Sequence, residues 1–125
     1  MEKQKFFTNE MIQGVAVVTL ESELSNYQGD AFLSAIQELG EKYARDGTNV
    51  ALVDFSRVKF FGSSVLEGLR LLWKELGAGE GHVSLCSLNE VCDQIIHLSH
   101  FDHVWTVYPD RQAALTELSA PHNNG

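Results

Sequence analysis

A strand, a turn and a helix follow one another between residues 50 and 76, and no other stretch constrains the fold as strongly. Residues 50–53 form a continuous apolar run, VALV, which Asp54 closes. Such a run is typical of a strand in a parallel or mixed sheet that helices cover. The helix is indicated by apolar residues that recur at spacings of three and four: Val65, Leu66, Leu69, Leu72, Trp73 and Leu76. The turn between strand and helix carries two hydroxyl groups, and we expect the functional site there.

The start of this helix has two candidate caps. Ser64 and Glu67 fit a capping box, in which Ser64 is the N-cap and Ser63 stays free to face solvent. In the alternative, Ser63 is the cap itself. The sequence leaves both alternatives open. The end of the helix is better marked, because Gly77 is a suitable C′ residue.

The segment DFSRVKFFGSS, residues 54–64, resembles the central signature of the STAS family, the sulfate-transporter and anti-sigma-factor-antagonist domains. In that family a strand ends in Asp, a short apolar segment follows, and Asp-Ser-Ser or Asp-Ser-Thr opens a helix. By the order of the predicted elements, the resemblance extends over roughly residues 10–118. It implies that Ser63 occupies the position that is phosphorylated in the bacterial antagonists, by a partner that is both a kinase and an anti-sigma factor.

Three positions depart from the family pattern. Gly62 replaces the Asp before the phosphorylated Ser, Val65 replaces a Gly after the serine pair, and Ser25 replaces an Asp of the preceding loop, residues 21–30. Gly62 and Ser25 together remove two carboxylates from the expected neighbourhood of Ser63. The fold is compatible with the first change, because glycine is permissive in a turn.

The resemblance places the partner-binding surface on this turn and on the loop beside it. Its predicted members are Ser25, Phe61, Gly62, Ser63, Ser64 and Val65. Phe60 and Phe61 are neighbours in the turn, and alternation predicts that one of them enters the core while the other is exposed.

Length, charge and cysteine spacing restrict the class of protein. The 125 residues are expected to form one domain, residues 1–118, followed by a disordered polar tail, residues 119–125. The net charge of -8 argues against nucleic acid, whose phosphates attract basic surfaces. No apolar run approaches the roughly 20 residues of a membrane span, and no signal-peptide core follows the polar N-terminus, so a cytoplasmic location is expected. Cys86 and Cys92 lie outside any CxxC spacing and are predicted to be buried free thiols.

The remaining residues alternate between strand and helix patterns. We predict strands at residues 5–8, 14–20, 82–86 and 104–108, and helices at residues 27–46, at 90–98 and from Pro109 onward. The first two strands would pair through a turn at residues 9–10 or 13–14. In the helix at 90–98, Val91, Ile95 and Leu98 would share one apolar face, with Cys92 at its edge.

The predicted order β-β-α-β-α-β-α-β-α indicates a single α/β domain with a mostly parallel sheet and right-handed crossovers. The resemblance adds that the sheet is small and mixed, and that about four helices lie chiefly on one face of it.

Neither a catalytic motif nor a metal-binding motif emerges from the sequence. His97, His100 and His103 are spaced by three, but the helix is expected to end near Ser99, and no carboxylate pattern completes a ligand set. The hydrolase elbow G-x-S-x-G is absent, as are the P-loop and the G-x-G-x-x-G motif. We therefore predict a protein that is not an enzyme and that uses no cofactor.

Two functions remain, and both are binding functions. In the first, the chain is a bacterial partner-switching module similar to an anti-sigma factor antagonist, which acts in signal transduction and transcription regulation through phosphorylation of Ser63. In the second, which Gly62 and Ser25 favour, it is a non-phosphorylated STAS scaffold subunit of a larger signalling assembly. The expected partners are an anti-sigma factor that resembles a serine kinase, or other STAS proteins. The expected state is a monomer or a weak dimer.

Overall fold

The computed structural model describes residues 6–21, 29–77, 82–101 and 104–119. Within these ranges the elements follow the predicted order β-β-α-β-α-β-α-β-α. They are β1 (Phe7–Ile12), β2 (Val15–Leu20), α1 (Gly29–Asp46), β3 (Val50–Asp54), α2 (Ser63–Glu75), β4 (His82–Cys86), α3 (Glu90–Leu98), β5 (Thr106–Tyr108) and α4 (Arg111–Leu118). Apart from Ser119, the predicted disordered tail lies outside the described residues.

The strands form one mixed sheet whose order in space is also the order in the chain, β1-β2-β3-β4-β5. β1 and β2 are antiparallel, and every following pair of neighbours is parallel. The β1–β2 hairpin closes through Gln13 and Gly14, whose φ angles are 52° and 85°. Two successive positive φ angles suit the right-handed twist of a tight hairpin. Of the two turns that the sequence allowed, the structure therefore has the one at residues 13–14.

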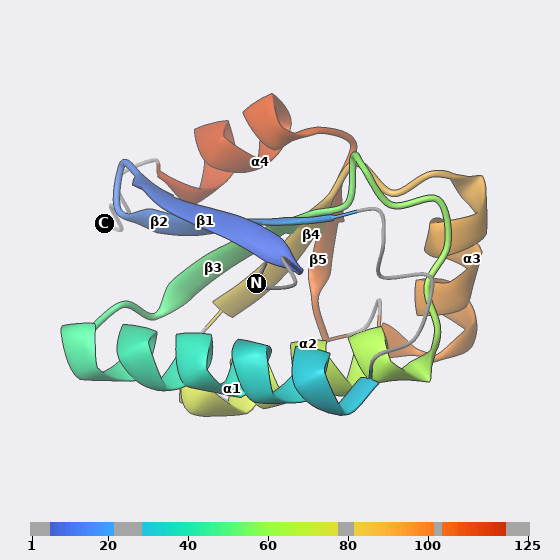
Figure 1. Ribbon diagram of the computed structural model, residues 1–125. Coiled ribbons are helices and arrows are strands. Elements are labelled where there is room, and N and C mark those ends of the chain that lie inside the picture. The colour runs from blue at the N-terminus through green and yellow to red at the C-terminus, as the bar shows by residue number, and fades with distance from the viewer. Residues whose placement is uncertain (1–5, 22–28, 78–81, 102–103, 120–125) are drawn as a thin grey trace.

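The helices cover the two faces of the sheet unequally, as Figure 1 shows: α1, α2 and α3 lie on one side and α4 lies on the other. The main core fills the space under the first three helices and includes Leu20, Ile36, Val53, Leu69 and Ile96. A smaller core under α4 contains Val15, Val17, Leu52, Cys86 and Ala114. Alternate residues of β2 and β3 thus enter opposite cores, which is why these strands read as continuous apolar runs. The prediction of helices chiefly on one face is confirmed.

The last two elements begin later than predicted. The backbone N–H groups of Val104 and Trp105 both donate to the carbonyl of Phe101, so these residues form a turn and β5 starts only at Thr106. α4 starts after Asp110, whose side chain accepts a hydrogen bond of 2.8 Å from the N–H of Ala113. An Asp at this position is a favoured N-cap, and Pro109 therefore precedes the helix.

The bounds of α3 agree with the prediction, but its buried face does not. Cys92 and Ile96 face the core, whereas Val91 and Leu98 are 49% and 74% exposed. The Sγ atom of Cys92 lies 3.8 Å from the carbonyl oxygen of Val58, which turns this side of the helix toward the chain before α2. The expected face is corrected accordingly, because Val91 and Leu98 are exposed and only Ile95 of the three packs against the main core.

Two glycines allow α1 and α2 to pack closely. A Cβ atom at Gly40 of α1 would lie 2.8 Å from Cβ of Glu75, and one at Gly68 of α2 would lie 2.5 Å from Cε2 of Phe32. Both distances are shorter than a carbon–carbon contact permits. Gly40, which interrupts the helical pattern in the sequence, is thus explained by the approach of α2.

Replacing Gly68 with alanine should destabilise the protein, although alanine favours helix formation in general. The ring of Phe32 is buried and has little room to move, and overpacking of this kind costs about 1–3 kcal/mol in the free energy of unfolding. Urea denaturation of Gly68→Ala would measure the loss. Phe32→Leu should lower stability by itself, but the double variant should be more stable than the sum of the two losses predicts. A Gly68→Ala protein as stable as wild type would contradict this packing.

Tyr43 predicts a specific sensitivity to alkaline pH. Its side chain is buried, its hydroxyl has no hydrogen-bond partner in the described part of the chain, and burial raises its pKa from 10.0 to about 12. Its contribution to stability is therefore complete below about pH 10 and is lost as the pH rises toward 12. We expect Tyr43→Phe to lose less stability over this interval, as measured by urea unfolding at several pH values. The buried Cys86 thiol, whose pKa is about 11, titrates in both proteins and so serves as an internal reference. Parallel stability curves for the two proteins would argue against the effect.

Candidate functional site

The β3–α2 loop, residues 55–62, is held in place by three side chains that point inward. Phe55, Val58 and Phe61 are buried in the main core, and the rings of Phe55 and Phe61 lie 5.3 Å apart. Phe60 points outward and is 48% exposed. The loop is therefore a fixed support that presents Phe60 and the start of α2 to solvent.

Neither serine caps α2. The helix begins at Ser63, its N-cap is Gly62, and no side chain donates or accepts a capping hydrogen bond there. Both serines thus lie within the first turn of the helix, and the predicted capping box of Ser64 and Glu67 is not formed. The end of the helix agrees with the prediction, because Gly77 follows the C-cap with a φ of 92°.

The two hydroxyl groups nevertheless differ in access. Ser63 is exposed, whereas Ser64 is half-buried against the first residue of α1. A Cβ atom at Gly29 would lie 2.6 Å from Oγ of Ser64, so this hydroxyl lies close beside the start of α1. Of this pair, Ser63 carries the more accessible hydroxyl.

The start of α2 suits an added negative charge. The first turn of a helix carries backbone N–H groups without helical acceptors, and the helix dipole places partial positive charge there. No acidic residue lies in the first turn of α2. Gly62, where the family has Asp, adds none just before it. A phosphate on Ser63 would therefore meet favourable electrostatics within the domain.

Two of the predicted partner-binding residues are buried in the structure. Phe61 and Val65 are only 1% and 2% exposed, so their side chains belong to the core and are unavailable to a partner. This corrects the expectation for both, and Phe60 is the apolar side chain that the loop exposes instead. Ser25 lies outside the described residues.

The start of α3 is joined to the same loop. Asn89 accepts a hydrogen bond of 2.8 Å from the N–H of Cys92 as the N-cap of α3, and its amide donates one of 3.1 Å to the carbonyl of Lys59. Phe60 and the exposed Val91 of α3 thus belong to neighbouring segments. The hydrogen bond from Asn89 to the loop could not be found in the sequence, because its acceptor lies 30 residues away.

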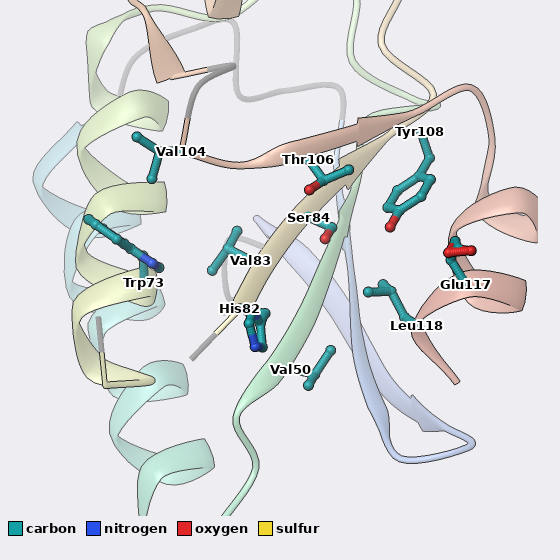
Figure 2. Close-up of a pocket in the computed structure, with 10 residues that line it drawn as sticks. All are labelled: Val50, Trp73, His82, Val83, Ser84, Val104, Thr106, Tyr108, Glu117 and Leu118. Atoms are coloured by element: carbon teal, nitrogen blue, oxygen red, sulfur yellow. The ribbon is translucent and has the colours of Figure 1, made fainter. Parts of the chain in front are cut away.

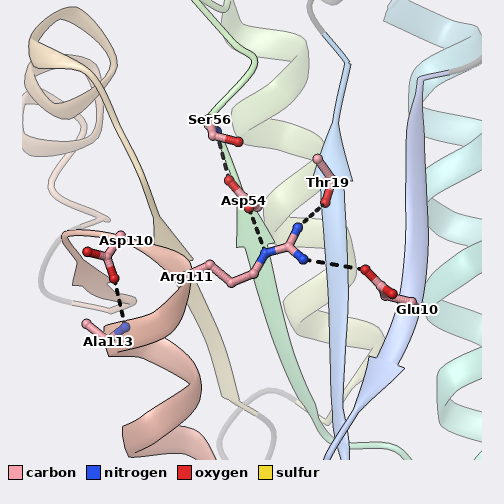
Figure 3. A network of polar contacts seen from close by, with 7 residues as sticks. All are labelled: Glu10, Thr19, Asp54, Ser56, Asp110, Arg111 and Ala113. Carbon is pink, nitrogen blue, oxygen red and sulfur yellow. Dashed lines mark hydrogen bonds and ion pairs between the residues drawn. The ribbon is translucent and has the colours of Figure 1, made fainter.

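Arg111 connects the end of β3 to α4 and to two other strands (Figure 3). Its Nε donates to Oδ2 of Asp54 at 3.0 Å, and its terminal nitrogens lie 2.8 Å from Oγ1 of Thr19 and 3.4 Å from Oε2 of Glu10. The other oxygen of Asp54 accepts 2.8 Å from the N–H of Ser56 at the start of the loop. One buried carboxylate therefore links the loop, the sheet and α4.

The described residues contain no group of three or more potential metal ligands. His103 lies outside them, so the predicted spacing of three histidines is not described in full. Cys86 and Cys92 are buried and free, as predicted. Burial raises the pKa of both thiols, which keeps them protonated and makes them poor nucleophiles and metal ligands. Over the described part of the chain, no helix combines the length and the hydrophobicity that crossing a bilayer requires.

Comparisons with known proteins agree with this fold. A model of the STAS domain family matches residues 7–114. An anti-sigma factor antagonist from Mycobacterium paratuberculosis is 26% identical, with a TM-score of 0.74 over 91% of this chain and 93% of that chain. An anti-sigma-factor antagonist (STAS) domain protein from Planctomyces limnophilus is 24% identical, with a TM-score of 0.74 over 90% and 96%. The unphosphorylated form of the anti-sigma factor antagonist SpoIIAA is 18% identical, with a TM-score of 0.64 over 90% and 96%. None of the curated protein sequences matches this chain.

Replacing Arg111 with methionine should destabilise the protein, because it leaves the carboxylate of Asp54, only 4% exposed, without its cation. Removing one partner of a buried ion pair costs about 3–5 kcal/mol, and the partial exposure of Arg111 reduces the expected loss to about 2 kcal/mol. Chemical denaturation would measure it. Asp54→Asn should be destabilising too, and the double variant should lose clearly less than the two single losses combined. Strictly additive losses would show that the two side chains do not interact.

Proposed function

This chain belongs to the STAS domain family, and from that membership we propose that it is a partner-switching interaction module of the anti-sigma factor antagonist type, regulated by phosphorylation of Ser63. The observation that carries the proposal is the difference between the two serines at the start of α2. Ser63 is exposed on a rigidly supported helix start, whereas Ser64 is half-buried beside Gly29. The 26% identical antagonist from Mycobacterium paratuberculosis supports the class of function.

The proposed mechanism is electrostatic. Unmodified Ser63 and the exposed ring of Phe60 offer a neutral, partly apolar surface to a partner. Phosphorylation adds about -1.5 to -2 charges and three strong acceptor oxygens. The free N–H groups of α2 accommodate this charge within the domain, so the fold need not change. A partner docked over the same residues would instead bury a dianion, and the complex would dissociate.

Gly62 affects how a kinase would recognise the site. Without a carboxylate beside Ser63, no like charge opposes the incoming phosphate. Two exposed cations, Arg57 and Lys59, precede the site in the β3–α2 loop, and Glu67 follows Ser63 by one turn of α2. Arg57 is already paired with Glu21 at 3.5 Å, which leaves Lys59 as the side chain more available to a partner. The proposed partner is therefore an anti-sigma factor with serine-kinase character whose contact does not depend on the missing Asp.

The second candidate function is a non-phosphorylated scaffold that binds other STAS proteins. Its support is the loss of the family carboxylates at positions 62 and 25, together with apolar side chains on the surface of the described chain, Phe60 and Val91. In this case Ser63 would be one contact residue among several. In both cases we propose a binding role without catalysis, in the bacterial cytoplasm, for a monomer or weak dimer.

Ser63→Glu should abolish partner binding and leave the fold intact. We expect its melting temperature to lie within about 3 °C of wild type, because an exposed side chain at a helix start is being changed. Partner capture from native lysate, read by mass spectrometry, should recover a kinase-like anti-sigma factor with wild type and with Ser63→Ala, but not with Ser63→Glu. Ser34→Glu, which adds the same charge at an exposed position of α1, serves as the matched control.

Two results would count against the switch. If all four baits recover the same partners, especially other STAS proteins, the scaffold function is favoured. If incubation of the lysate with ATP phosphorylates Ser63→Ala as strongly as wild type, Ser63 is not the acceptor.

A further inference from the structure

A groove of about 310 Å³ lies at the edge of the sheet, away from Ser63 (Figure 2). It exists because β5 is shorter than β4. β4 pairs with β3 from His82 to Cys86, but with β5 only from Ser84 to Cys86. Among the described residues, the first part of β4 therefore has no strand partner on its outer edge. α2 forms one wall of the opening and the last turn of α4 forms the other.

Polar side chains without partners converge on the α4 side of this groove. Ser84 and Thr106 are paired across β4 and β5, and Tyr108 lies two residues further along the same face. Figure 2 shows the hydroxyl groups of Ser84 and Tyr108 directed into the space between β4 and α4, with the carboxylate of Glu117 opposite. Within the described part of the chain, none of these four side chains makes a hydrogen bond.

Ser84 makes this arrangement unusual for a surface groove. The residue is only 3% exposed, and it lines the floor of the groove. A ligand that reaches this floor can hydrogen-bond to the hydroxyl of Ser84, which favours groups that can donate or accept a hydrogen bond.

The charge of the lining residues determines which ligand charge is favoured. Glu117 is the only Asp, Glu, Lys or Arg among the described lining residues, and the whole chain carries a net charge of -8. Burial, and then the negative charge of Glu117, raise the pKa of Tyr108, so its phenol stays neutral. Anions are therefore repelled, and a group that donates several hydrogen bonds to a carboxylate and to hydroxyl oxygens is favoured.

The apolar lining residues indicate the chemistry of the remainder of the ligand. Val50 and Leu118 lie below the polar cluster and contribute to the smaller core, and the indole of Trp73 lies across the opening on the α2 side. An aliphatic chain can bury itself against the first two residues, and an indole face also attracts cations. Cavities of this size hold small organic molecules.

We propose that this groove binds a small organic cation, an ammonium group on an aliphatic stem. Glu117, Ser84 and Tyr108 would hold the ammonium group, and Val50 and Leu118 would pack against the stem. The ammonium group has three donors and the site offers one carboxylate and two hydroxyl oxygens, so every donor has an acceptor. The site is independent of the proposed switch at Ser63 and adds a ligand-responsive surface on the other side of the molecule.

The test uses the full chain, labelled with ¹⁵N, titrated with n-butylammonium chloride at constant ionic strength. Two compounds with the same stem, 1-butanol and sodium butyrate, separate the charge from the apolar contact. We expect saturable amide shifts at Ser84, Thr106 and Tyr108 with the ammonium compound, at a dissociation constant on the order of 1 mM for so small a ligand. Glu117→Gln should weaken this binding about tenfold or more. Glu90→Gln, which removes another exposed carboxylate, at the start of α3, should leave it unchanged.

Several outcomes would overturn the proposal. They are the absence of saturable shifts at the groove, an equal response to 1-butanol, and an equal weakening by Glu117→Gln and Glu90→Gln. Tighter binding of Nα-acetyl-lysine methylamide than of butylammonium would assign the groove to a lysine side chain of another protein. Glu117 is exposed, so Glu117→Gln should keep the wild-type melting temperature, and a large fall would mean that the residue is structural. Ser63→Glu should bind butylammonium as wild type does, which separates this test from that of the proposed switch.

Discussion

The buried carboxylate of Asp54 is the interaction on which the rest of the structure depends. It stands at the carboxyl end of β3, where the two cores and the β3–α2 loop meet. Its two oxygens accept hydrogen bonds from Arg111 of α4 and from the backbone of Ser56. A carboxylate in such a place is stable only when both oxygens have partners. The position of α4 and the entry of the loop toward Ser63 are therefore fixed by the same charged group.

The parts of the fold that the sequence predicts are those that local patterns encode. The strands at residues 50–54 and 82–86 have apolar runs between polar residues. The start of α3 has Asn89, a preferred cap. The face of α3 was predicted wrongly because a helix of nine residues can satisfy helical spacing in two ways. Val91, Ile95 and Leu98 form one apolar row and Cys92 with Ile96 forms another. The loop to which the helix is tied, and not its own pattern, decides between them.

The candidate site was predictable in place but not in detail. The serine pair at a strand-to-helix turn is visible in the sequence. Ser64 is the less accessible serine, and it lies close to Gly29, a residue 35 positions away that only the packing of α1 brings near. The burial of Phe61 rather than Phe60 depends on Phe55 in the same way. Nothing in the sequence indicated the role of Arg111, because a single arginine at the start of a helix is common on protein surfaces.

The order of the strands has a consequence for how this chain folds. Each strand pairs with the strand that precedes it in the sequence, so the sheet can grow in one direction as the chain lengthens. The hydrogen bonds of Arg111 are different, because they span 57, 92 and 101 residues. Among the side-chain hydrogen bonds of the described residues they close the longest loops, and a longer loop has a larger entropic cost of closure. We therefore expect α4 to dock last, after the strands that it joins have already assembled.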